Sequence, residues 1–126
     1  MPKPRGYAMP QTSLPKVVRF AELEFQPRFE HGEMAQLAEV SGTSRGSELG
    51  VGFAHMTNAR IDWTIRYDEV LIVLSGALKV HTDSGTLSAG PRDSIWLPKG
   101  TKLTYEAKDA LVAYAIHPAD WAARTG

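Results

Sequence analysis

Cysteine is absent from this chain of 126 residues. The absence excludes disulfide bonds, thiolate metal sites and cysteine nucleophiles together, and it fits a cytoplasmic protein. An excess of either charge is also lacking, because 14 Lys and Arg balance 14 Asp and Glu. Without a basic excess to contact phosphates, we expect no nucleic-acid partner. The longest apolar run, residues 70–74, is too short to cross a membrane, so we expect no membrane partner.

Proline is concentrated at the start of the chain, where Pro2, Pro4, Pro10 and Pro15 stand within the first fifteen residues. Each proline removes a backbone donor and restricts φ, which disfavours a helix or an inner strand. We therefore divide the chain into an extended N-terminal arm over residues 1–16 and one domain over residues 17–126. The domain is long enough to form one ordinary hydrophobic core.

Short apolar segments separated by turn residues fill the rest of the chain. Alternation and turn chemistry predict strands over residues 17–20, 49–56, 63–67, 69–74, 77–82, 86–89, 94–97, 101–106 and 110–117. Residues 57–60, 83–85 and 98–100 are predicted turns. Many short strands at regular spacing indicate an all-β sandwich or barrel, with the jelly roll among the candidates. A single helical turn is expected to follow Pro118.

Two spaced motifs give a more specific prediction. Glu69 is followed seven residues later by Gly76, and Asp93 is followed by Pro98 and Gly100. These residues resemble the two motifs of the cupin superfamily. The resemblance implies a single double-stranded β-helix, that is, a jelly-roll barrel with the arm extending from it. Cupins usually bind a metal through three histidines and one glutamate. At the histidine positions this chain has Trp63, Ile65 and Leu103, so only Glu69 remains of the set.

Within the superfamily, the chain resembles the EutQ-like branch. The resemblance rests on five segments: Gly50-Val51-Gly52-Phe53, the run from Trp63 to Glu69, Gly76-Ala77-Leu78, Pro98-Lys99-Gly100 and Pro118-Ala119-Asp120-Trp121. It covers residues 34 to 121, and that branch also lacks the cupin histidines. For function, the resemblance implies acetate-kinase activity and an association with bacterial microcompartments.

The resemblance also predicts which side chains surround a cavity. By position, Trp63, Ile65, Glu69 and Leu103 would form its floor. Strand alternation would turn Tyr67 and Tyr105 inward as well. An apolar, aromatic cup with one carboxylate suits a small organic ligand, fixed by a few polar groups.

Glu69 is the candidate catalytic residue. A carboxyl group that is partly removed from water favours its neutral form, which suits a general acid or base. The alternative is a structural glutamate held by a tyrosine hydroxyl. His55 shares a strand face with Phe53 and is a candidate ligand-binding residue that could reach the cavity close to Glu69. With Glu69 and a tyrosine it could hold a metal weakly. A strand histidine bonded to a neighbour is the more common arrangement. Since a metal site needs several convergent ligands, we expect no metal and no cofactor.

Phosphoryl transfer finds no support in the residues themselves. A Gly-rich phosphate cradle is absent, and the adjacent Asp68 and Glu69 point to opposite faces of a strand. Lys99, in the turn before Gly100, is a candidate contact for an anion or a solvated turn lysine. Three hypotheses remain: a metal-independent small-molecule-binding cupin; an enzyme, using either Glu69 or acetate-kinase chemistry; and a structural or assembly partner. We expect a homodimer, with an exposed sheet face near Trp96 as its interface.

Overall fold

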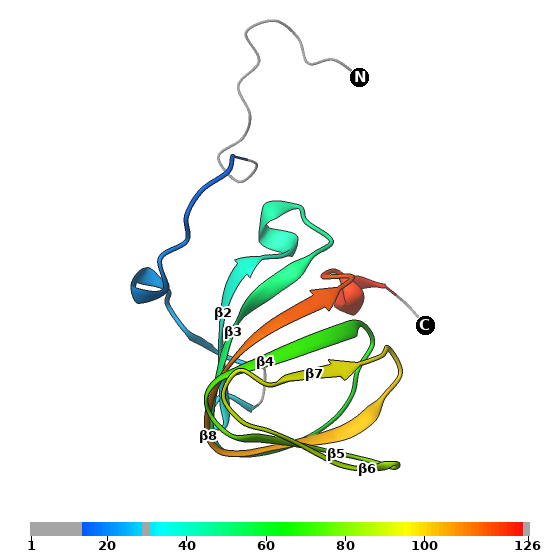
Figure 1. Cartoon of the computed structure of the whole chain (residues 1–126). Coiled ribbons are helices and arrows are strands. Elements are labelled where there is room, and N and C mark those ends of the chain that lie inside the picture. Colours follow the sequence, from blue (N-terminus) through cyan, green and yellow to red (C-terminus); the bar gives the residue numbers. More distant parts are fainter. Residues whose placement is uncertain (1–13, 29–30, 125–126) are drawn as a thin grey trace, which may run out of the picture.

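The structure is a computed structural model that describes residues 14–28 and 31–124. The described residues form one eight-stranded antiparallel sheet that curls into a barrel (Figure 1). Its strands are β1 (Gln26–Pro27), β2 (Ala35–Ser41), β3 (Gly50–Thr64), β4 (Asp68–Gly76), β5 (Leu78–Thr82), β6 (Gly85–Ala89), β7 (Ser94–Leu97) and β8 (Lys102–His117). Short 3-10 helices accompany them at η2 (Phe20–Glu22), η4 (Thr43–Arg45) and η5 (Trp121–Ala123). The all-β prediction is confirmed.

Two long strands hold the barrel together. β3 and β8 pair along their whole length, from Gly50 opposite Ile116 to Thr64 opposite Lys102. The other edge of β8 is divided, because its second half pairs with β4 and its first half with β5. β7 extends the sheet beyond β4, and β6 extends it beyond β5. The chain therefore forms two layers that share β3 and β8, and Figure 1 shows both strands curving from one layer into the other.

The turn predicted over residues 57–60 and the break predicted between residues 106 and 110 are wrong. β3 and β8 continue through them, with Thr57 opposite Asp109 and Ala59 opposite Ala107. Asn58 between them has φ 43°, a left-handed conformation that asparagine tolerates. The turn-forming residue bends the strand while the pairing with β8 resumes at once. The local composition correctly indicated a bend, but it could not show that the hydrogen bonds between β3 and β8 continue beyond it.

Other local predictions had mixed outcomes. The strand predicted over residues 17–20 is wrong, since η2 begins at Phe20 and no strand precedes it in the part of the chain described. The helical turn after Pro118 is confirmed as η5. For the arm over residues 1–16, residues 1–13 lie outside the described residues. Residues 14–16 are exposed and form no strand or helix.

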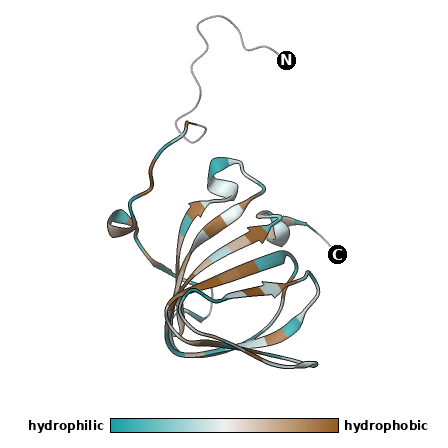
Figure 2. Ribbon diagram, viewed as in Figure 1, coloured by the Kyte–Doolittle hydropathy of each residue, from teal (hydrophilic) through white to brown (hydrophobic). Residues whose placement is uncertain are grey.

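Hydrophobic residues concentrate in the strands, as Figure 2 shows, and their inward side chains form the core. The largest fully buried side chains come from both layers: Ile61, Ile65, Val73, Leu78, Val80, Leu97 and Val112. Glycine makes room on the inner face of β3. A Cβ at Gly52 would lie 2.5 Å from the hydroxyl oxygen of Tyr114 and would overlap the carbonyl of Ala38. A glycine inside a strand thus permits a close approach of neighbouring groups.

Candidate functional site

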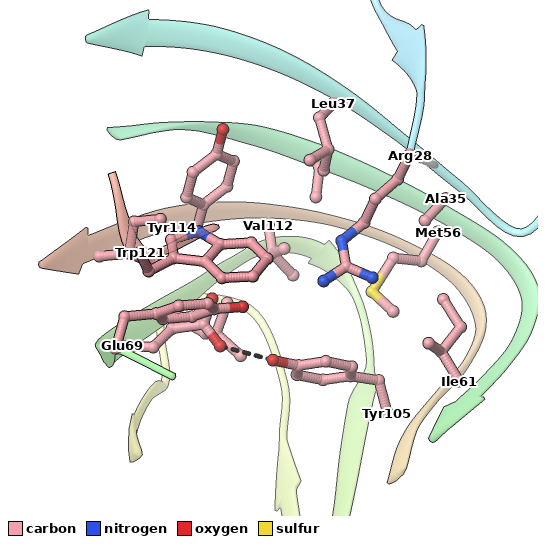
Figure 3. A pocket seen from close by; sticks show the side chains of 14 residues that line it. Arg28, Ala35, Leu37, Met56, Ile61, Glu69, Tyr105, Val112, Tyr114 and Trp121 are labelled. Atoms are coloured by element: carbon pink, nitrogen blue, oxygen red, sulfur yellow. Dashed lines mark hydrogen bonds between the residues drawn. The ribbon is translucent and has the colours of Figure 1, made fainter. Parts of the chain in front are cut away.

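A cavity of about 200 Å³ lies between the two layers of the barrel. Most of its wall is aliphatic and comes from β2, β3, β4 and β8. Its polar or aromatic residues are Arg28, Tyr67, Glu69, Tyr105, Tyr114 and Trp121. Figure 3 shows Arg28 and Glu69 on opposite sides of the cavity, with Trp121 between them at its edge. An apolar enclosure with a few converging polar groups is typical of sites for small organic molecules.

Glu69 is the buried carboxyl group of this cavity. It lies near the start of β4 and is only 6% exposed. The hydroxyl of Tyr105, from β8, donates a hydrogen bond of 2.7 Å to its Oε1 atom. Burial raises the pKa of Glu69 to about 7, although the Tyr105 hydrogen bond and the charge of Arg28 act in the opposite direction. The carboxyl group can therefore gain or lose a proton near neutral pH.

Two tyrosines place hydroxyl groups beside Glu69. Burial raises the pKa of both Tyr67 and Tyr105, and in each the charge of Glu69 is the second cause. The indole Nε1 of Trp63 donates a hydrogen bond of 3.2 Å to the Tyr67 hydroxyl oxygen. That oxygen acts as an acceptor, so its own proton can be donated to another group. Both tyrosines therefore remain neutral hydrogen-bonding groups at physiological pH.

Aromatic rings close one side of the cavity. Trp121, in η5, lies 5.3 Å from the Tyr67 ring and 5.8 Å from the Trp63 ring, measured between centroids. Outside it, the guanidinium of Arg66 lies 5.3 Å from the Trp121 ring and donates to two backbone carbonyls of the C-terminal segment. Arg66 therefore holds η5 against the barrel.

Arg28 supplies a positive charge to the same cavity. It follows β1, and its backbone N–H donates to the carbonyl of Ala35 at 3.0 Å. Its guanidinium lies 4.8 Å from the Trp63 ring centroid, and its charge opposes the rise in the pKa of Tyr67. Its charge lowers the pKa of Glu69, against the larger effect of burial. A cation–π contact of this kind stabilises a guanidinium that is partly removed from water.

The structure brings some of the predicted site residues together and separates others. Tyr67, Glu69 and Tyr105 line the cavity, and Trp63 contacts it through Tyr67. Ile65 and Leu103 are buried in the core instead of lining it. The structure places His55 on the outer face of β3, where its Nε2 lies 3.0 Å from Asp109 Oδ1. Lys99 is exposed in its turn, and its backbone N–H donates to Asp68.

The orientation of β3 explains the position of His55. The small residues Gly50, Gly52 and Ala54 face the interior, and the large side chains of the opposite face point outward. Phe53 packs there against Phe20, at 5.1 Å between ring centroids. Alternation alone shows that two faces exist, but only packing decides which of them is inside.

Sequence reasoning did not place Arg28, Tyr114 or Trp121 in the cavity. Tyr105 and Tyr114 are nine residues apart, so a regular strand would point them to opposite faces. Both face the cavity because the alternation of buried and exposed residues along β8 is interrupted at Lys108 and Asp109, which are both exposed. Arg28 and Trp121 come from irregular segments at opposite ends of the domain. No periodicity connects such residues before the chain is folded.

A metal does not fit the donors that the cavity offers. Among residues 14–28 and 31–124, no three His, Cys, Asp or Glu side chains lie close enough together to hold a metal ion. At the cavity, one carboxyl group stands beside tyrosine hydroxyls and a guanidinium, which is a poor donor set for a transition metal. The absence of a metal therefore stays a prediction.

The fold and its cavity define the chain as a cupin. An RmlC-like cupin from Shewanella frigidimarina superimposes with a TM-score of 0.69 over 84% of this chain and 93% of the other, at 14% identity, which supports the fold alone. The model of the family described as ethanolamine utilisation protein EutQ matches residues 16–123. The chain therefore belongs to the EutQ family, and the resemblance predicted from its sequence is confirmed.

Two relatives show how far the similarity extends. The acetate kinase EutQ of Clostridioides difficile (strain 630) is 38% identical over 77 residues, which are 60% of this chain and 49% of that protein. The structure of an ethanolamine utilization protein Q from Salmonella typhimurium LT2 has a TM-score of 0.75 and 27% identity, over 82% of this chain and 85% of the other. This chain spans about half the length of the curated relatives it matches.

Within the residues that the structure describes, we find no helix with the length and apolar character needed to span a membrane.

Proposed function

We propose that this chain is a small-molecule-binding cupin whose ligand occupies the cavity beside Glu69, without a transition metal. One observation carries the proposal: a cavity of about 200 Å³ with apolar walls, onto which the polar atoms of Glu69, Tyr67 and Tyr105 converge. Burying these polar groups costs free energy, so a site that keeps them around an open space is suited to a ligand that hydrogen-bonds to them.

A thermal-shift screen tests this proposal. Small acids, amides, amines, alcohols and transition-metal ions are added to the wild type and to the Glu69→Gln variant, which keeps the shape and removes the charge. We expect at least one organic compound to raise the unfolding temperature of the wild type, and we expect the size of this shift to differ in the variant. If no organic compound shifts the wild type, or if both proteins respond alike, the binding site is not beside Glu69. One equivalent of a transition metal in the purified protein would contradict metal independence.

The same geometry supports a second candidate, a metal-independent enzyme in which Glu69 is the general acid or base. A group with a pKa of about 7 is suited to accept and return a proton near neutral pH. Tyr105 would hold the carboxyl group in position through its 2.7 Å hydrogen bond. Conversion of a bound compound by the wild type, but not by Glu69→Gln, would distinguish this candidate from simple binding.

Acetate-kinase activity is a third candidate, and its support comes from relatives. Proteins at 30% and 38% identity carry that name, but the chain corresponds to only about half of each. The cavity offers a phosphoryl group one guanidinium and no acidic cluster for Mg²⁺ among the described residues. Transfer of phosphate from ATP to acetate by this chain would favour the kinase over the binding protein.

The outer face of β4 and β7 supports a homodimer and, as an alternative function, a structural or assembly role. Ile72, Leu74 and Trp96 are 40%, 43% and 58% exposed on adjacent strands. Contiguous apolar surface of this kind commonly marks an interface. We also infer a cytoplasmic location, which the lack of cysteine favours.

We expect light scattering to show a dimer that the Trp96→Ser variant converts to a monomer, because this change removes the largest apolar side chain from the face. Leu87→Ser is the matched control, since Leu87 is 43% exposed but lies on β6, in the other layer. A monomeric wild type, or an equal effect of both variants, would contradict this interface.

A further inference from the structure

Arg28 gives the cavity a chemical preference that Glu69 and the tyrosines alone would not. Among the described residues that line the cavity, Arg28 supplies the positive charge and Glu69 the carboxyl group. Figure 3 shows the guanidinium entering from the side of β2 and β3, opposite Glu69. Whenever Glu69 holds its proton, the charged side chains of the lining sum to one positive charge. An anion is therefore the ligand charge that complements the cavity.

The Arg28 guanidinium also favours a ligand group of a particular shape. Its five N–H donors lie in one plane, which matches the two oxygens of a carboxylate. The Trp63 ring lies 4.8 Å from the guanidinium carbon and limits the directions in which the group can turn. The Tyr67 hydroxyl, which accepts from Trp63, can donate its own proton to the same carboxylate. Arg28 and Tyr67 thus form a pair of donors on one side of the cavity.

The size and walls of the cavity define the rest of the ligand. An engineered cavity of about 150 Å³ is known to accept benzene, so about 200 Å³ has room for roughly six to nine non-hydrogen atoms. Away from the polar groups, the wall is formed by Ala35, Leu37, Met56, Ile61, Leu71 and Val112. Such a wall favours contact with a hydrocarbon group. A purely polar ligand would have polar groups against this wall that lack hydrogen-bond partners.

We propose that the ligand is a small monocarboxylate with an apolar body of about six to nine non-hydrogen atoms in total, its carboxylate bound by Arg28 and Tyr67. This inference rests on the proposed binding function and names its ligand class. Acetate, with four non-hydrogen atoms, would fill only part of the space and leave the aliphatic wall uncovered. An amine would place a second positive charge near Arg28.

Glu69 faces the ligand from the opposite side, and its charge state matters for binding. The ionisable groups around it are Tyr105 and Tyr114 from β8, Tyr67 before β4, and Arg28. None of these tyrosines loses its proton near neutral pH, because burial raises the pKa of all three. Glu69 is thus the group of this set that titrates near pH 7. Ionised Glu69 repels a carboxylate, so the affinity for one should fall as the pH rises through this value.

Calorimetric titration at about pH 6 tests the ligand class with hexanoate, hexanamide and hexylamine, which share a six-carbon chain, and with acetate. A hydrogen-bonded charge pair is worth enough for us to expect hexanoate to bind about tenfold to a hundredfold more tightly than hexanamide. Hexylamine should bind more weakly than either, and acetate about a hundredfold more weakly than hexanoate, which has four more CH₂ groups to bury. The Arg28→Met variant should lose the preference for hexanoate over hexanamide.

Two further variants keep the result interpretable. Arg28→Lys retains the charge without the planar fork and should keep an intermediate preference for hexanoate. Arg60→Met is the matched control, because Arg60 is exposed on β3, places its Nη1 3.5 Å from Glu106 Oε1 and does not line the cavity. This variant should keep the full preference. If Arg28→Met fails to fold, Arg28→Lys is compared with the wild type. A reduced preference for hexanoate in Arg28→Lys then supports the role of Arg28, and an unchanged preference overturns it.

The outcomes separate this inference from the proposed function. Binding of hexanamide or hexylamine as tight as that of hexanoate overturns the carboxylate class but leaves a small-molecule site. Acetate binding as tight as hexanoate overturns the apolar body. A preference for hexanoate that survives in Arg28→Met overturns the role of Arg28. If no compound in this set or in the broader thermal-shift screen binds, the proposed function fails as well.

Discussion

Between about pH 4.5 and pH 8, the unfolding free energy of the wild type should fall by about 3 kcal/mol relative to that of the Glu69→Gln variant. Burial raises the pKa of Glu69 from an ordinary value of 4.5 to about 7. Between these two values the folded state keeps a proton that the unfolded state has released. Stability therefore decreases as the pH rises, with no penalty below the lower value and the full penalty above the higher one. Urea unfolding at a series of pH values measures the difference.

Tyrosine variants test the cause of this pH dependence. Tyr105→Phe removes the hydrogen bond that lowers the pKa of Glu69, so the loss of stability should extend to higher pH. Tyr114→Phe is the control, because Tyr114 lines the same cavity while the bond from Tyr105 to Glu69 stays intact. Parallel stability curves for the wild type and Glu69→Gln would show that Glu69 titrates as an ordinary exposed carboxyl group. Water would then reach Glu69 in the cavity, although the lining of the cavity is mostly apolar.

The Gly76→Ala variant should lose about 4 kcal/mol of unfolding free energy or fail to fold. Gly76 ends β4 with φ 76°, where an L-residue is strained by about 1–2 kcal/mol. In addition, a Cβ there would overlap the carbonyl oxygen of Asp109 in β8. β8 cannot easily move away, because Asp109 and Ala110 pair with β3 on their other side. Urea unfolding of both proteins gives the difference.

Gly100→Ala is the matched control for Gly76→Ala. Gly100 also has a positive φ, 94°, but apart from its two chain neighbours no heavy atom of the described residues lies within 4 Å of a Cβ built on it. This variant should therefore lose only the conformational strain, about 1–2 kcal/mol. Equal losses of unfolding free energy in the two variants would mean that β8 moves away readily from a side chain at position 76. In that case the close contact with β8 would contribute little to the cost of Gly76→Ala.

Residue types close together in the sequence were enough to predict most strands and the family. The spacing of Glu69, Gly76, Pro98 and Gly100 reflects local geometry, since glycines and prolines act on the backbone at their own positions. The same local reasoning mistook the bend at Asn58 for the end of a strand. A bend and a strand end have similar composition, and only the continuous partner strand β8 distinguishes them.

The sequence by itself determined the all-β class and the inward direction of Tyr67 and Tyr105, because alternation and turn chemistry are local properties. Its resemblance to the cupin motifs predicted the barrel and the inward position of Glu69. Tertiary structure alone decided that Arg28 and Trp121 complete the cavity, since they lie 93 positions apart in the chain. It also turned His55 outward, by packing the small face of β3 inside. Which face is buried, and which distant segments close a cavity, depend on long-range packing that no local pattern encodes.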